Sequence, residues 1–353
     1  MQAERIMHSE TNSSLPVNKV ALKFPKISIG EFGGIWVALA ALIVLCAFVA
    51  PGTLRMGALL SLAPFASFLC IVSVGQMLVI RQRGLDMSAG SMMTLSGLML
   101  GYFSSHLEMT LFPVLITLVL TALLGAVNGL LVARVNISPI VATLAVDALL
   151  IGGVRAISGG TAKTMPADFQ QLAHGTILGL PSSMVIALAC IGVVAMLVNL
   201  TLAGRNFIAV GASPRAAAAS GLRVLYYQVG AYAAASACFS LAGMLLAGFA
   251  GSASQTAGAD YLLPGIVAVI VGGTQFSGGK GSILATTVAA LFMAQLQQLV
   301  LSMGASPAVQ LLVQAAAIVV AVAVRTLPRL YRQFTTKTAQ TAVSLPSTNL
   351  TRS

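Results

Sequence analysis

The chain has 353 residues, of which 58% are hydrophobic and only 8% are charged. A soluble domain carries roughly a quarter charged residues, so this composition excludes an ordinary soluble enzyme or binding module and predicts a protein that faces lipid over most of its area. A net charge of +11 would favour nucleic acid as the partner of a soluble protein. Here the basic residues follow membrane topology instead, so no nucleic-acid partner is expected.

The hydropathy pattern predicts an all-α polytopic membrane protein with about ten transmembrane helices. We expect residues 1–34 to form a cytosolic N-terminal tail, because no apolar core with a small-residue cleavage site comes this early. Residues 35–324 are the predicted transmembrane domain, and residues 325–353 a basic cytosolic tail. A helix needs roughly 20 residues to cross a bilayer. The predicted spans are 35–50, 57–80, 88–104, 111–133, 138–157, 183–203, 225–249, 262–274, 281–301 and 307–324.

The weakest predicted span is 262–274, which is short and contains Pro264 near its start. If this segment crosses, most Lys and Arg residues of the loops and of the C-terminal tail join those of the N-terminal tail on one side of the membrane. If it does not cross, Lys280 and the C-terminal basic residues change sides, which the positive-inside rule disfavours. We therefore expect ten spans in a bacterial inner (plasma) membrane, with both termini cytoplasmic.

No cluster of side chains predicts catalysis, a metal site or a cofactor. The four cysteines lie in apolar runs without a metal-binding spacing, and the three histidines are scattered. Residues 273–281 come nearest to a phosphate-binding loop, but Thr274 stands at its first glycine position and Gly281 at its hydroxyl position. We interpret this segment as a glycine-rich cytoplasmic turn. The chain is therefore not expected to be an enzyme, and any ATP must be bound by another polypeptide.

The longest cytoplasmic connection, 204–224, contains a predicted short helix. Ser213 and Pro214 suit its N-cap and first turn, alanines follow as strong helix formers, and Gly221 is a suitable stop. This helix is either a structural elbow along the inner face of the membrane or a docking helix for a cytosolic partner. The residues assigned to that docking role are Arg205, Pro214, Arg215, Ala216, Ala217, Ala218, Ser220 and Gly221.

Two acidic residues are candidates for a transport path. Asp86, together with Ser88, precedes a predicted span, where capping and the helix dipole also explain both residues. Asp147 lies near the middle of the span 138–157. An ionisable group there costs about 2.5–3.5 kcal/mol on insertion scales, so such residues usually face a cavity or a partner. A structural pair with Arg155 is the alternative for Asp147.

Four stretches stand in order along the chain: 84–90 (GLDMSAG), 128–133 (NGLLVA), 204–222 and 272–281 (GGTQFSGGKG). Together they resemble the permeases of ribose-type ABC sugar importers, which include those for xylose, galactose and autoinducer 2. The resemblance covers essentially residues 60–325. The chain departs from the family at Arg81 and Arg83, which replace the small or polar residues usual before the first stretch.

The resemblance implies a dimer of identical or related permeases that sits on two ATPase subunits and receives solute from a periplasmic binding protein. In such importers the loop matching 204–222 carries the helix that couples to the ATPase. We assign a candidate translocation path to Asp86, Ser88, Asn128 and Asp147. The predicted function is the permease subunit of an importer for a small sugar-like solute, powered by a separate ATPase. The alternative is a secondary transporter, coupled to protons or sodium, that uses Asp86 and Asp147 as ion sites.

Overall fold

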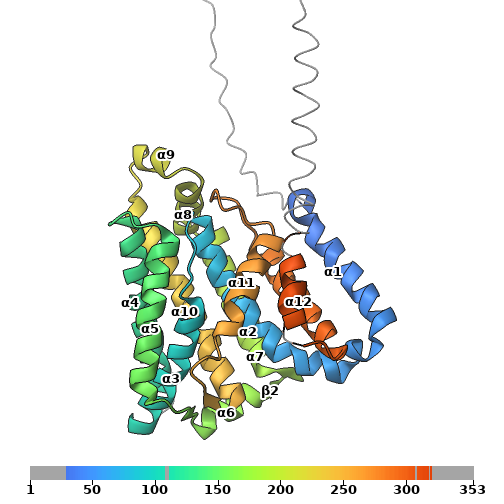
Figure 1. Cartoon of the computed structure of the whole chain (residues 1–353). Coiled ribbons are helices and arrows are strands. Elements are labelled where there is room, and N and C mark those ends of the chain that lie inside the picture. The colour runs from blue at the N-terminus through green and yellow to red at the C-terminus, as the bar shows by residue number, and fades with distance from the viewer. Residues whose placement is uncertain (1–28, 108–110, 307, 318, 320–353) are drawn as a thin grey trace, which may run out of the picture.

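The computed structural model describes residues 29–306 except 108–110, together with residues 308–317 and 319. This part of the chain is a bundle of helices (Figure 1). The long helices are α1 (Ile29–Val49), α2 (Met56–Arg81), α3 (Ala89–Leu107), α4 (Leu111–Ala133), α5 (Pro139–Ser158), α7 (Ser182–Leu200), α10 (Val224–Ala250) and α12 (Ile283–Ser302). The shorter elements are η1 (Pro51–Leu54), α6 (Ala167–His174), α8 (Leu202–Ala212), α9 (Pro214–Ala219), α11 (Ala259–Val271), β1 (Lys163–Thr164), β2 (Thr176–Ile177), β3 (Leu180–Pro181) and β4 (Ser252–Ala253).

Six of the described helices, α2, α4, α5, α7, α10 and α12, are long and apolar enough to cross a membrane. Shorter apolar helices cover Gly33–Val49, Ala259–Val271 and Ala308–Ala317. The helical, polytopic fold class is therefore confirmed, whereas the count of about ten spans and the cytoplasmic placement of both termini stay predictions. Residues 1–28 of the predicted N-terminal tail and the whole predicted C-terminal tail, 325–353, lie outside the described residues.

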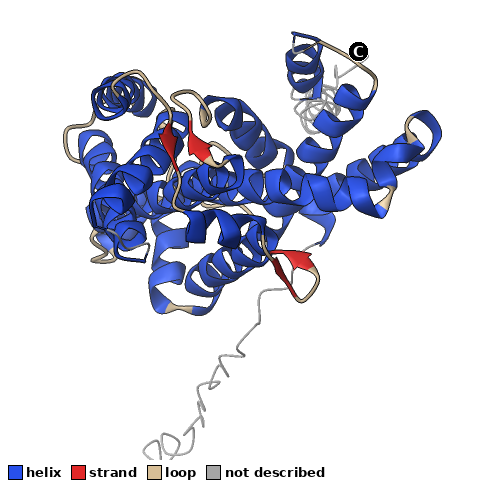
Figure 2. Cartoon of the chain, turned by 90° about the horizontal axis from the view of Figure 1, so that it is seen from below, coloured by secondary structure: helices blue, strands red, loops and turns tan. Residues whose placement is uncertain are grey.

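The connecting elements lie at two opposite ends of the bundle. Figure 1 shows α8 and α9 at one end and α6 with β2 at the other. Two antiparallel strand pairs, β1–β4 and β2–β3, are drawn red in Figure 2. The second pair is a hairpin whose two-residue turn, Leu178 and Gly179, has φ values of 54° and 80°, as a type I′ turn requires.

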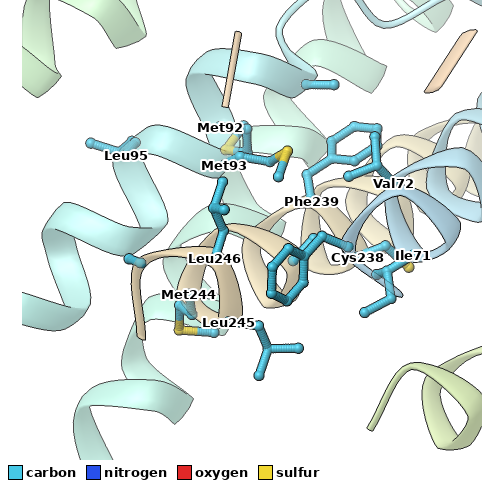
Figure 3. Packing of buried hydrophobic residues seen from close by; sticks show 14 of the residues in the cluster. Ile71, Val72, Met92, Met93, Leu95, Cys238, Phe239, Met244, Leu245 and Leu246 are labelled. Carbon is cyan, nitrogen blue, oxygen red and sulfur yellow. The ribbon is translucent and has the colours of Figure 1, made fainter. Parts of the chain in front are cut away.

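Helix α10 forms the centre of the bundle and packs most extensively against α4, α2 and α3. A Cβ atom on Gly129 of α4 would lie 2.7 Å from the Cα atom of Val229 on α10. Only glycine therefore permits this crossing, in the way that small residues let transmembrane helices approach closely. The buried side chains where α2, α3 and α10 meet include Ile71, Val72, Met92, Met93, Phe239 and Met244 (Figure 3).

Two helices, α3 and α11, begin beside one another in buried surroundings. The backbone N–H of Gly258, just before α11, donates to the hydroxyl of Thr94 on α3 at 3.1 Å. From this point α3 runs towards the β1 end of the bundle, and α11 leads to the glycine-rich turn at the α8 end. With 13 residues, α11 is about 20 Å long, too short to cross a bilayer by itself. The predicted span 262–274 is therefore a half-length helix that continues an irregular segment.

Candidate functional site

The segment between α2 and α3 carries a fully buried carboxylate, Asp86. Its Oδ1 atom accepts hydrogen bonds from the backbone N–H of Ser88 at 2.9 Å and from the Ser88 hydroxyl at 2.6 Å. The side-chain amide of Gln76, on α2, donates to the Asp86 carbonyl at 2.5 Å. The Oδ2 atom of Asp86 has no hydrogen-bond partner within the described residues. The local bonding expected before a helix thus accounts for one of the two carboxylate oxygens.

Side chains from α4 and α5 complete this cluster. The Asn128 amide donates to the Ser88 hydroxyl at 2.9 Å. The Thr143 hydroxyl accepts from the backbone N–H of Met87 at 3.0 Å and donates to the carbonyl of Pro139 at 2.8 Å. Both Asn128 and Thr143 are fully buried. We call this cluster the Asp86 site; its members are Gln76, Asp86, Ser88, Asn128 and Thr143.

The fourth predicted path residue, Asp147, lies one helical turn beyond Thr143 on α5 and is half-buried. Its charge has a smaller effect on Asp86 than the burial of Asp86 itself. Among the described residues Asp147 forms no hydrogen bond or salt bridge. The alternative pair with Arg155 is not formed, because eight helical residues separate the two by about 12 Å along the axis and Arg155 is exposed.

The Asp86 site offers a carboxylate, two hydroxyls and two amides, groups that can donate and accept hydrogen bonds with a polar solute. All five side chains are buried. In this conformation the site is therefore closed to water. In the part of the chain that the structure describes, no group of His, Cys, Asp or Glu could hold a metal ion.

A second polar assembly fixes the end of α2 to α8 and to the glycine-rich turn 273–281. The Arg81 guanidinium donates to the Gly279 carbonyl from Nε at 3.3 Å and from Nη2 at 3.2 Å, and the Gly279 N–H donates back to the Arg81 carbonyl at 2.9 Å. Gln82 donates to the Phe207 carbonyl at 2.7 Å. Arg83 donates to the last two carbonyls of α8. We call this assembly the α2–α8 junction.

The short helix predicted in 204–224 is present as α9. The Ser213 hydroxyl caps it by accepting from the Ala216 N–H at 3.3 Å, and Gly221, with a φ of 80°, ends it. Most residues assigned to docking are exposed: Arg205, Arg215, Ala216, Ala218, Ser220 and Gly221. Pro214 is half-buried, and Ala217 is buried against the chain itself with 5% exposure. The surface available to a partner is therefore the opposite side of the helix from Ala217.

Sequence reasoning missed three features of these sites. The residues adjacent to Gln76 and Thr143 in the sequence contain no motif that predicts their contacts with the segment 84–88. Helix α8 was expected to be a loop, since glycine, asparagine and arginine interrupt its apolar residues. Its buried residues Phe207 and Val210 nevertheless anchor it. Arg81 and Arg83 were visible as departures from the family pattern, and that signal could have identified the junction.

Known proteins resemble this chain over most of its length. Residues 58–322 match the family described as branched-chain amino acid transport system / permease component. The autoinducer 2 import system permease protein LsrD of Escherichia coli strain K12 is 36% identical over 273 residues, which cover 74% of this chain and 82% of that protein. The Shigella flexneri protein of the same name gives the same values, and that of E. coli O157:H7 is 35% identical over 243 residues, covering 66% and 73%. No solved structure matches the chain.

The described apolar helices, six of them long enough to cross a bilayer, place the chain among polytopic membrane proteins. The chain belongs to the family of branched-chain amino acid transport system permease components. Its resemblance to the permeases of ribose-type ABC importers is confirmed, since the import permeases above belong to that group. It is therefore a permease component of a bacterial inner-membrane importer.

Proposed function

We propose that this chain is the transmembrane permease subunit of an ABC transporter that imports a small sugar or sugar-like solute. Autoinducer 2, the solute in the names of its relatives, is the first candidate. The observation that carries the proposal is the two-part construction of the bundle. A closed polar site lies in the interior, and a short exposed helix stands at the end where the α2–α8 junction lies.

The proposed path passes the Asp86 site, with Asp86, Ser88, Asn128 and Asp147 along it. Sugar hydroxyls exchange hydrogen bonds readily with carboxylates, hydroxyls and amides. A passage site must release the solute as well as receive it, so loose, exchangeable contacts suit it better than a tight pocket. Selectivity in this arrangement comes from the periplasmic binding protein, which delivers the solute.

The proposed energy source is a separate ATPase subunit that docks on α9. A helix of six residues is marginal on its own and gains order by packing against something. Its exposed side carries small alanines beside Arg215, so it fits a shallow groove with acidic residues at its rim. Closure of the ATPase subunits on ATP would displace α9 and separate the helices that close the Asp86 site.

The proposed assembly has a second permease copy or a related permease, two ATPase subunits and the binding protein. The binding protein would meet the α6 end of the bundle, opposite α9 (Figure 1). The proposed topology has ten spans in the lipid bilayer, tails 1–34 and 325–353 in the cytoplasm, and no nucleic-acid partner. A secondary transporter with ion sites at Asp86 and Asp147 is not favoured, because the relatives are permeases of import systems.

The experiment that tests this function is reconstitution in liposomes. The permease is purified with an ABC ATPase and a periplasmic binding protein from the same organism, and uptake of labelled autoinducer 2 and of ribose is measured with ATP inside the vesicles. We expect uptake that requires all three components and ATP. Uptake by the permease alone, driven by a proton or sodium gradient, would instead establish the secondary transporter.

A further inference from the structure

Arg83 occupies a backbone position that favours glycine. Helix α2 ends in a Schellman motif, in which the Arg83 N–H donates to the Ile80 carbonyl at 2.9 Å and the Gly84 N–H to the Val79 carbonyl at 3.1 Å. The residue at this position takes the left-handed conformation, and Arg83 has a φ of 65°. A side chain with a Cβ atom is disfavoured there, and glycine is the usual occupant. The arginine is thus costly for the backbone, and its side chain must offset that cost.

The Arg83 side chain holds the end of α8. Its Nε atom donates to the Gly211 carbonyl at 3.1 Å, and its Nη2 atom donates to the Ala212 carbonyl at 2.5 Å. These are the last two residues of α8, directly before the Ser213 cap of α9. A cation is favoured at a helix C-terminus, where the carbonyls lack partners and the dipole is negative. Arg83 therefore links the end of α2 to the connection between α8 and α9.

The residues beside Arg83 make this link rigid. Gln82 reaches the Phe207 carbonyl earlier in α8, and Arg81 is joined to Gly279 in both directions. The contact is close, since a Cβ on Gly279 would lie 2.7 Å from the Cα of Ala212. Because these contacts are close, α8 cannot move unless the end of α2 moves with it or the hydrogen bonds of the junction break.

The end of α2 leads directly into the Asp86 site. Only Gly84 and Leu85 separate Arg83 from Asp86. The backbone of this segment is held from both sides, by Gln76 at the Asp86 carbonyl and by Thr143 at the Met87 N–H. A displacement of Arg83 therefore shifts the segment that carries the buried carboxylate. The partners of this segment on α4 and α5, Asn128 and Thr143, stay with their own helices.

We propose that Arg83 is a positioning residue that transmits the movement of α9 to the Asp86 site. The proposal rests on the proposed function, because it assumes that an ATPase displaces α9. In this role the guanidinium touches neither solute nor nucleotide. Its two bonds to the α8 carbonyls make the movement of the docking helix and the opening of the site one event.

The test is Arg83→Gly, which removes the two side-chain bonds from Arg83 to α8 and suits the left-handed backbone better than arginine does. Arg134→Gly is the matched control. Arg134 is exposed just after α4, and within the described residues its side chain makes no hydrogen bond. Both variants remove one arginine from a predicted cytoplasmic connection, so any effect on topology is shared. Arg83→Lys, which can reach one carbonyl but not hold two, serves as the conservative variant.

Three quantities are measured on each reconstituted importer: co-purification of the ATPase, the rate of ATP hydrolysis, and solute taken up per ATP hydrolysed. For Arg83→Gly we expect normal co-purification and hydrolysis, with uptake per ATP reduced about tenfold, the scale of losing a charge-assisted hydrogen bond. Arg83→Lys should fall between, and Arg134→Gly should equal the unaltered chain. The ratio of uptake to hydrolysis distinguishes coupling from folding, because a merely structural loss lowers both in parallel.

Two outcomes would overturn the inference while leaving the proposed function intact. One is an Arg83→Gly importer with the uptake per ATP of the unaltered chain. The other is a parallel loss of ATPase binding, hydrolysis and uptake in both Arg83 variants. If the unaltered chain itself neither binds an ATPase nor supports ATP-dependent uptake, the proposed function fails first, and that result is visible before any variant is compared.

Discussion

The Asp86 site predicts that Ser88 and Asn128 stabilise the bundle as a pair. In Ser88→Ala the carboxylate of Asp86 loses the hydroxyl bond at 2.6 Å, and the Asn128 amide loses its acceptor at 2.9 Å. A hydrogen bond to a charged group contributes about 1.5–3 kcal/mol, and a buried donor left without a partner costs about 1–3 kcal/mol. We therefore expect Ser88→Ala to lower the free energy of unfolding by about 3 kcal/mol.

The change Asn128→Leu tests the other half of the pair. Leucine has the same number of side-chain heavy atoms and the same branch point as asparagine but no polar atoms, and the Ser88 hydroxyl can still donate to Asp86. The Asn128 Oδ1 atom accepts no hydrogen bond within the described residues, so its removal leaves no donor unpaired. We expect a loss of about 1 kcal/mol. In the double variant no Asn128 donor is orphaned, so the combined loss should be smaller than the sum by about 1–2 kcal/mol.

The assay is reversible unfolding in mixed detergent micelles, followed by the loss of helical circular dichroism, for the unaltered chain, both single variants and the double variant. Ser105→Ala is the control, because Ser105 is exposed and its hydroxyl bonds only locally, to Tyr102 and His106. It should change the free energy of unfolding by less than about 0.5 kcal/mol. If the losses at positions 88 and 128 add within about 0.5 kcal/mol, the two side chains do not act as a pair and the reasoning is refuted.

Three further predictions concern transport, docking and topology. Asp147→Asn removes the charge that acts on Asp86 and should change the uptake rate with ATPase assembly intact; unchanged uptake would remove Asp147 from the path. Ala218→Asp puts a charge on the exposed side of α9, and burying it unpaired against the ATPase should weaken co-purification by at least about tenfold, whereas Leu178→Asp at the far hairpin should not. Single cysteines at 178 and 218, in a chain without its native cysteines, should react with an impermeant thiol reagent from outside and inside respectively; the reverse pattern would contradict the proposed orientation.

Most local elements of this protein can be predicted from its amino-acid sequence. Long apolar runs predict α2, α4, α5, α7, α10 and α12 because a helix satisfies its own backbone hydrogen bonds wherever lipid surrounds it. The boundaries of α9 were equally readable, since Ser213 and Gly221 act through bonds to residues only three or four positions away. The family resemblance added the class of transporter and the position of the predicted docking loop.

The pairing of polar groups, in contrast, depends on how the helices pack together. Ser88 is bonded to Asn128, forty residues along the chain, and Arg81 to Gly279, almost two hundred residues away. Such partners depend on how helices cross and on where glycine lets backbones touch, which no local pattern encodes. The same holds for Ala217, whose burial against its own bundle distinguishes it from its exposed neighbour Ala218. A helix follows from bonds within a few residues, but a site follows from the packing of several helices at once.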